Sequence, residues 1–206
     1  MTAVAGSARP TDFRPALTDA RLRTIAECLL DIRYETELEL SSPLDDGYTR
    51  GTTTFGRQRN ALIQLAQGGM YEDWLALTHA GMDLTFTIGD VPCRFFADDP
   101  SNPRKPGFFR RNVCDQLFAE SIGEPVLFRF VVAKPETADD EAEVFFIGYD
   151  EGWNEVFRWQ HSRSTPVMVS IDETLPAEVP LAPAKVRPRV ESVERDRAAG
   201  ETPDQE

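Results

Sequence analysis

The chain of 206 residues carries 35 acidic and 22 basic side chains, a net charge of −13, and 41% of its residues are hydrophobic. This length suits one domain with tails, and a charge this negative repels nucleic acids and anionic membranes on average. The start of the chain lacks the apolar run of a signal peptide, and no apolar stretch approaches the roughly 18 residues of a membrane span. We therefore expect a cytoplasmic protein without a membrane partner.

The two ends of the chain differ in composition from the middle. After Asp172 the chain reads "ETLPAEVPLAPAKVRPRVESVERDRAAGETPDQE", with five prolines, many charges and no aromatic residue. Such a segment cannot bury enough apolar surface to offset the loss of chain entropy, so residues 173–206 are predicted to be a disordered tail. Residues 1–16 are predicted to be a short flexible lead, which leaves residues 17–172 as a single globular domain.

The first predicted helix has the clearest local signal. Thr18 is a plausible N-cap, and Leu22, Ile25, Leu29 and Ile32 follow it at helical spacing. The stretch "YETELEL" then alternates between apolar or hydroxyl side chains and glutamates. This pattern fits either a half-buried strand or a continuation of the helix.

A second helix is predicted over residues 54–67, after the turn-rich break "SSPLDDGYTRG" and before a Gly-Gly pair that would end it. The stretch "MYEDWLALTHAGM" is ambiguous, and we interpret it as a short helix rather than a strand. A third helix is predicted over residues 109–121, where Gly123 and Pro125 would end it.

The remaining segments have the two-residue period of strands. "DLTFTIGDVPCRFF" predicts a hairpin around Gly89 and Asp90, and "VLFRFVV", "EVFFIGYD" and "NEVFRWQ" predict a three-stranded meander. "PVMVSI" is a possible final strand. This order predicts an α+β fold with an antiparallel sheet, made of the hairpin plus the meander. The N-terminal helices and the one inserted helix would pack on one face.

No catalytic motif is present. The chain has no G-x-S-x-G elbow, no phosphate loop and no H-E-x-x-H, and its histidines are His79 and His161. Cys93 could act as a thiol nucleophile with His161 as its general base, but the spacing of the two residues does not favour that role over a buried thiol. Three cysteines fit neither a disulfide framework nor a zinc motif. We expect no cofactor and no metal, and a binding protein rather than an enzyme.

Two basic groups are the candidate binding residues. One surrounds a Gly-Thr-Thr-Thr turn expected to lead into a helix, where free N–H groups, hydroxyls and arginines could hold a phosphate or carboxylate. The other lies in "RKPGFFRR", where basic side chains flank a proline and two phenylalanines, and nucleic-acid grooves combine arginines with stacking aromatics. The same stretch also fits a stiff connection between elements. The candidate residues are Arg50, Arg57, Arg59, Arg104, Lys105, Arg110 and Arg111.

Acidity is concentrated in the C-terminal β region. Residues 114–160 hold 11 acids and 3 bases, a local net charge of −8. The leading hypothesis is therefore a non-enzymatic interaction or regulatory module that binds a protein partner through this acidic region, and a basic protein would suit it. The alternative is a binder of nucleic acid or of a phosphorylated ligand that uses the two basic groups. The sequence does not indicate an oligomeric state.

Overall fold

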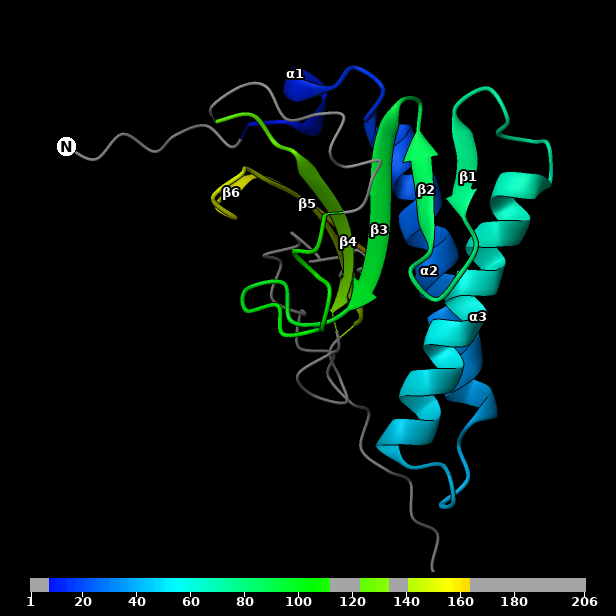
Figure 1. Cartoon of the computed structure of the whole chain (residues 1–206). Coiled ribbons are helices and arrows are strands. Elements are labelled where there is room, and N and C mark those ends of the chain that lie inside the picture. Colours follow the sequence, from blue (N-terminus) through cyan, green and yellow to red (C-terminus); the bar gives the residue numbers. More distant parts are fainter. Residues whose placement is uncertain (1–7, 112–122, 134–140, 164–206) are drawn as a thin grey trace, which may run out of the picture. The chain divides into compact units, whose positions relative to one another are not determined.

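The computed structural model describes residues 8–111, 123–133 and 141–163 (Figure 1), and all that follows concerns these residues. The chain divides into two units, Met1–Pro166 and Val167–Glu206, and the predicted tail and the possible final strand lie outside the described residues. The described part has three helices and one six-stranded sheet, which confirms the α+β class. None of its helices is long and apolar enough to cross a lipid bilayer.

The first helix, α1 (Pro10–Phe13), lies in the segment predicted as a flexible lead. Proline at the first helical position has its φ already set for the helix, and Pro10 is buried. The ring of Phe13 stacks on Phe157 of strand β6 (Glu155–Ser162), with ring centroids 5.6 Å apart. Part of the predicted lead is therefore a short helix held by aromatic packing.

Helix α2 (Asp19–Glu39) begins where the sequence predicts, because the side chain of Thr18 accepts a hydrogen bond from the Arg21 amide. Its apolar stripe is buried in the core. The helix runs through "YETELEL", where Arg33 and Glu37 form an ion pair one turn apart, 2.6 Å long. Of the two possibilities for that stretch, the helix is the one observed.

Helix α3 (Gly47–Gln67) begins seven residues before the predicted start. Its N-cap is Asp46, whose carboxylate accepts a hydrogen bond from the Thr49 amide at 2.7 Å. That hydrogen bond lowers the pKa of the Asp46 carboxyl. The amide of Gln58 donates to the carbonyl of Leu29 at 2.8 Å, which ties α3 to α2.

The six strands follow one another in the sheet in chain order, β1 to β6. Neighbours pair antiparallel everywhere except between β3 and β4, which are parallel. The strands not yet bounded are β1 (Leu75–His79), β2 (Thr85–Ile88), β3 (Val91–Ala97), β4 (Leu127–Ala133) and β5 (Glu143–Tyr149).

The sheet is therefore mixed. The predicted arrangement, an antiparallel sheet made of the hairpin plus the meander, is wrong because the hairpin joins the meander through a parallel pair. The chain leaves β3 at one end of the sheet and returns through residues 98–126, which makes the two strands parallel. The stretch interpreted as a short helix contains β1, which extends the sheet by one strand. Residues 109–111 of the predicted inserted helix are not helical, and the rest of that helix lies outside the described residues.

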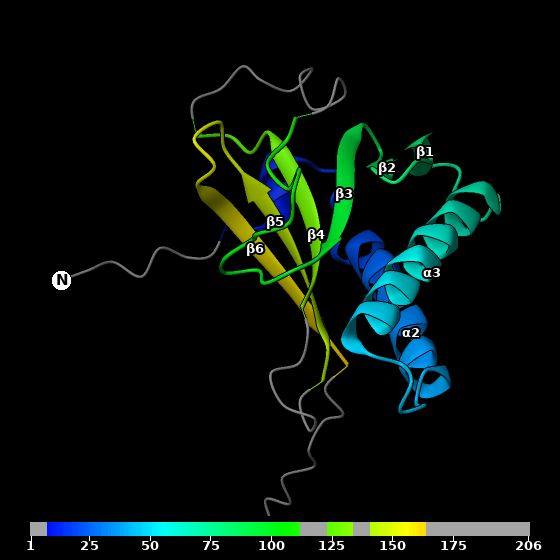
Figure 2. The ribbon, with the colours of Figure 1, turned by 60° about the horizontal axis from the view of Figure 1, so that its bottom comes forward.

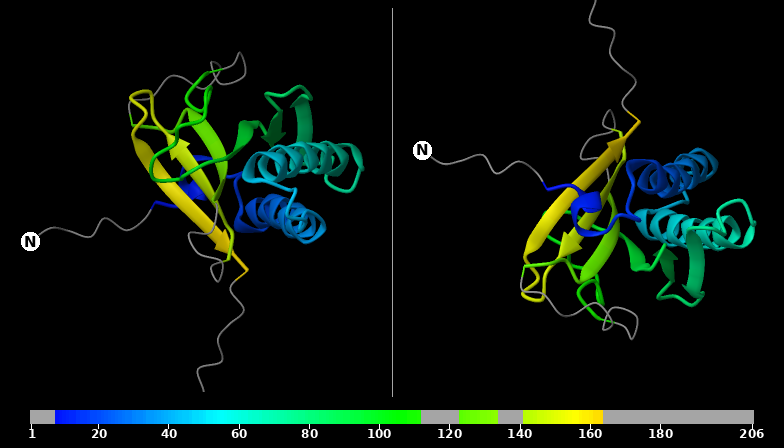
Figure 3. Two further views of the ribbon diagram at one scale, coloured as in Figure 1. Left: turned by 90° about the horizontal axis from the view of Figure 1, so that it is seen from below. Right: turned by 90° about the horizontal axis from the view of Figure 1, so that it is seen from above.

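The two faces of the sheet are covered differently. Helices α2 and α3 lie together on one side of the strands (Figures 2 and 3), over the larger core cluster that includes Phe86, Phe130 and Phe146. On the other face a smaller cluster packs under the loop of residues 98–111, which contributes Phe108. No helix of the described residues covers this second face.

Candidate functional site

The first basic group lies on α3, where Arg50 is exposed and the other two arginines contact the chain itself. Arg57 forms an ion pair with Glu39 at 2.5 Å. Arg59 donates to the carbonyls of Gly81 at 2.9 Å and Ala80 at 2.5 Å, which holds the loop between β1 and β2. The Gly-Thr-Thr-Thr segment is in the interior of the helix. The predicted helix start at this segment is therefore wrong, because the start with its free N–H groups lies at Asp46. Anion binding by these arginines stays a prediction.

The second basic group lies in the loop over the second face. The carboxylate of Asp98 accepts hydrogen bonds from the backbone amides of Arg104 and Lys105, at 2.8 and 2.7 Å. The guanidinium of Arg111 pairs with Glu151 at 3.3 Å. The backbone carbonyl of Arg110 accepts from two other arginines. The stretch is thus a structural connection, as one interpretation of the sequence had it.

A cavity of about 520 Å³ opens where these two segments meet. The first half of α3 forms one wall through Gly47, Gly51 and Phe55, and the end of β3 forms the other through Phe95 and Phe96. The rings of Phe55 and Phe95 stack 5.1 Å apart. This volume lies in the range typical of ligand pockets, roughly 300–1,000 Å³.

Two exposed apolar side chains mark the rim of this cavity. Tyr48 of α3 is 79% exposed and Met82 of the β1–β2 loop is 73% exposed. Of the seven candidate basic residues, only Lys105 lines the cavity. The two segments therefore converge, but the arginines that defined them do not.

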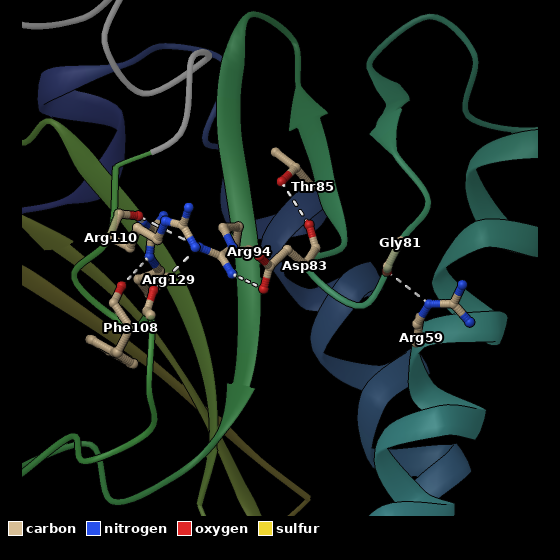
Figure 4. Close-up of polar contacts among 9 residues, drawn as sticks. Arg59, Gly81, Asp83, Thr85, Arg94, Phe108, Arg110 and Arg129 are labelled. Atoms are coloured by element: carbon tan, nitrogen blue, oxygen red, sulfur yellow. Dashed lines mark hydrogen bonds and ion pairs between the residues drawn. The ribbon is translucent and has the colours of Figure 1, made fainter.

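The polar part of the cavity is an ion pair whose two residues are not among the candidate binding residues. Arg94 of β3 is buried, and it donates to a carboxylate oxygen of Asp83 at 2.8 Å (Figure 4). The Asp83 side chain is 65% exposed, so the pair joins the interior to the surface. The Arg94 guanidinium also lies over the Phe96 ring, 5.1 Å from its centroid.

Arg94 belongs to a row of arginines across the second face. The register aligns it with Arg129 on β4, and Arg129 aligns through Ile147 with Arg158 on β6. All three donate to backbone carbonyls of the loop: Arg94 to Gly107, Arg129 to Phe108 at 2.9 Å, and Arg158 to Pro100 at 3.2 Å. Figure 4 shows Arg94 and Arg129 reaching the loop side by side. The row fixes the loop, and with it the cavity wall at Lys105.

The possible cysteine and histidine pair is not assembled. Cys93 is buried on β3 and donates weakly to its own strand at Val91. His161 lies on β6, three strand spacings away, which is about 14 Å across the sheet. Among the described residues no group of three or more His, Cys, Asp and Glu side chains could hold a metal ion.

Cys28 on α2 is expected to be a poor nucleophile. Burial, and then the nearby Asp31 carboxylate, raise the pKa of its thiol from 9.0 to about 11. Because only the thiolate reacts, the shift leaves about a hundredfold less reactive sulfur at pH 8. Iodoacetamide should therefore modify Cys28 at least tenfold more slowly in the folded chain than in urea, as followed by mass spectrometry of the peptide that carries it. Equal modification rates in the folded and the urea-unfolded chain would show that the Cys28 thiol is not buried and that its pKa is not raised.

No family model matches this chain, and neither a curated protein nor a solved structure is significantly similar to it, so the assignment of a function depends on the geometry of the cavity.

Proposed function

We propose that the protein is a non-enzymatic interaction module of the cytoplasm, and that it binds a protein partner at the cavity between α3 and β3. The observation that supports this is the cavity itself, with phenylalanines in its walls and the exposed side chains of Tyr48 and Met82 at its rim. Exposed apolar side chains gathered at a hollow are typical of interaction sites. Neither histidine nor cysteine is among the described residues that line it.

The acidic region, residues 114–160, stays in the proposal as a secondary surface. Several of its described acids already contact the chain's own side chains. Glu124 pairs with Arg14 at 3.6 Å, and Glu155 pairs with Arg158 at 2.6 Å. Residues 134–140, which carry three of its acids, lie outside the described residues. A basic stretch of the partner would meet this region after the cavity is filled.

Two glycines of α3 offer a matched test of the cavity. A Cβ atom at Gly51 or at Gly56 would meet nothing within 4 Å, but only Gly51 lines the cavity. Because glycine is a poor helix former, Gly51→Trp and Gly56→Trp should each leave the free energy of unfolding unchanged or raise it by about 0.5 kcal/mol. Urea unfolding measures this. A loss above about 1 kcal/mol in either variant would show that its site on α3 is not open.

The proposal is tested by affinity capture with the full chain from a lysate of its native host, with quantitative mass spectrometry of the captured proteins. We expect one partner or a few to be enriched on the wild type and on Gly56→Trp and to be lost on Gly51→Trp. A set of partners that does not change between the two variants would contradict a cavity-based interaction.

The alternative, a nucleic-acid binder, predicts a steep loss of affinity with salt, because bound basic side chains release counterions from the phosphates. We expect no such binding, since the arginines do not converge and the net charge is −13. Labelled single-stranded and duplex oligonucleotides, titrated at low and physiological salt, should bind no tighter than about 10⁻⁴–10⁻⁶ M.

The comparison variant has Arg104, Lys105, Arg110 and Arg111 all changed to Ala. A dissociation constant well below about 10⁻⁶ M at physiological salt for the wild type, with binding lost in this variant, would favour the alternative over the interaction module.

A further inference from the structure

The edge of the sheet beside the cavity is open. The antiparallel pairing of β2 with β3 ends at Phe86 and Cys93. The parallel pairing of β3 with β4 continues four residues further, to Ala97 and Val132. Residues 95–97 therefore pair with β4 on one side, and on the other side no strand of the described residues pairs with them. That unpaired side is the one that lines the cavity.

The hydrogen-bonding groups on this side can be assigned from the register. Ile88 and Val91 close the two-residue turn of the β2–β3 hairpin, so they exchange hydrogen bonds with each other. Alternation along β3 then directs the N–H and C=O groups of Phe95 and Ala97 toward the cavity and those of Phe96 toward β4. A row of free backbone groups is a template for another strand.

The opposite wall leaves room for a backbone. Gly47 and Gly51 lie one turn apart on α3, both line the cavity, and a Cβ at either would meet nothing within 4 Å. Glycine destabilises a helix by roughly 0.5–1 kcal/mol relative to alanine, so two of them on this face weaken α3 there. The arrangement gives a strand edge on one side and, on the other, a helix with two positions that carry no side chain.

The charges that line the cavity indicate the chemistry of its occupant. Asp83 is held by Arg94, whereas the Lys105 side chain is exposed and pairs with no carboxylate among the described residues. The lining therefore carries a net positive charge although the chain as a whole is at −13. A second copy of this chain is disfavoured as the occupant. It would place one Lys105 near another, and the two chains would repel each other because each has a net charge of −13.

We infer that the cavity takes an extended segment of the partner, which adds as a strand to β3 at residues 95–97. Its alternate apolar side chains pack against the outer edge of the stacked Phe55 and Phe95 rings, and an acidic side chain beside them meets Lys105. Main-chain hydrogen bonds supply affinity in such strand addition, and the pockets for alternate side chains supply specificity. This inference rests on the proposed function and names the form of the partner.

The test uses the full chain and two blocked hexapeptide probes, one alternating Glu with Val and the other alternating Lys with Val. We expect the Glu/Val peptide to bind at least tenfold more tightly. Its binding should slow hydrogen exchange at the amides of Phe95 and Ala97 at least tenfold. The Phe96 amide, already paired with β4, should not change and serves as the internal control.

Two variants separate strand addition from simple filling of the cavity. Ala97→Pro removes one N–H that faces the cavity and keeps the β4 ladder, because proline is tolerated at a strand edge. It should weaken Glu/Val binding at least tenfold, and so should Gly51→Trp, whereas Gly56→Trp should leave it unchanged.

Binding that Gly51→Trp abolishes and Ala97→Pro preserves would overturn strand addition and leave the proposed function standing. Peptide binding that neither variant changes would also overturn the inference, and so would the absence of binding for both peptides. The proposed function would then be tested by the affinity-capture experiment alone. Amides of Phe95 and Ala97 that are already protected in the free chain would show that the chain's own residues or a second copy occupy the edge, which overturns it as well.

Discussion

Phe130→Ala is expected to lower the free energy of unfolding by roughly 3–5 kcal/mol, the usual cost of truncating a buried phenylalanine. Phe130 lies on β4 at 0% exposure, with its ring 4.5 Å from that of Phe146 and 6.0 Å from that of Phe86. The three rings come from β4, β5 and β2, so the cavity left by alanine would open contacts across most of the sheet. Urea unfolding with a constant slope measures the loss.

Leu38→Ala is the control for this change. Leu38 lies on α2 and is 80% exposed, so its truncation should change the free energy of unfolding by less than about 0.5 kcal/mol. Phe145→Ala tests the opposite face of the sheet, where Phe145 is buried in the smaller cluster. If Phe130→Ala and Phe145→Ala both cost under about 1 kcal/mol, the assignment of the faces is wrong.

Arg129→Ala is expected to cost at least about 2 kcal/mol and to loosen the loop over the second face. Arg129 is fully buried and donates to the carbonyls of Phe108, Phe128 and Arg110, at 2.9, 3.1 and 3.3 Å. A buried carbonyl that loses its donor costs roughly 1–3 kcal/mol. Arg129→Lys should lose most of the same stability, because one ammonium cannot reproduce the planar fork of donors.

The measurement combines urea unfolding with hydrogen exchange in the loop. The amides of Phe108 and Arg110 donate within the loop, to Lys105 and Gly107, and should exchange faster in Arg129→Ala. Arg111→Ala removes an arginine whose partner Glu151 is 61% exposed, so it should cost under about 1 kcal/mol. Unchanged exchange in Arg129→Ala would show that the loop is held by other contacts.

The elements with strong local signals were predictable from the sequence. The Thr18 cap and the apolar stripe after it define α2, and the Gly89-Asp90 turn defines the β2–β3 hairpin. The positions of β4, β5 and β6 follow from alternation. These signals are local because a cap, a turn or a two-residue period is determined by neighbouring residues.

The elements that were predicted wrongly either have conflicting local signals or depend on tertiary contacts. The start of α3 contains Gly47 and Gly51, which disfavour a helix, yet the Asp46 cap begins it there. β1 reads as a helix by itself and is a strand because it pairs with β2. The parallel pairing of β3 with β4 could not be predicted from the sequence of either strand. The relative direction of the two strands depends on the connection through residues 98–126.

The candidate site was predicted only in part. The basic segments around 50–59 and 104–111 do meet at the cavity, but the candidate binding residues did not include Arg94 and Arg129, which hold the loop. A signal was present, because each of these two lies between apolar residues in a strand, in "PCRFF" and "LFRFV". An arginine at such a position must be buried and hydrogen-bonded, since an unpaired buried charge is costly.

The parallel junction between β3 and β4 also has a consequence for folding kinetics. The β2–β3 and β5–β6 hairpins close over short turns, and hairpins of this kind form in roughly 1–10 μs. The β3–β4 pairing must instead wait until residues 98–126 have brought distant parts of the chain together, which costs loop-closure entropy before any contact rewards it. The sheet is therefore expected to assemble from two halves, β1 to β3 and β4 to β6. The joining of these halves is expected to be the rate-limiting step.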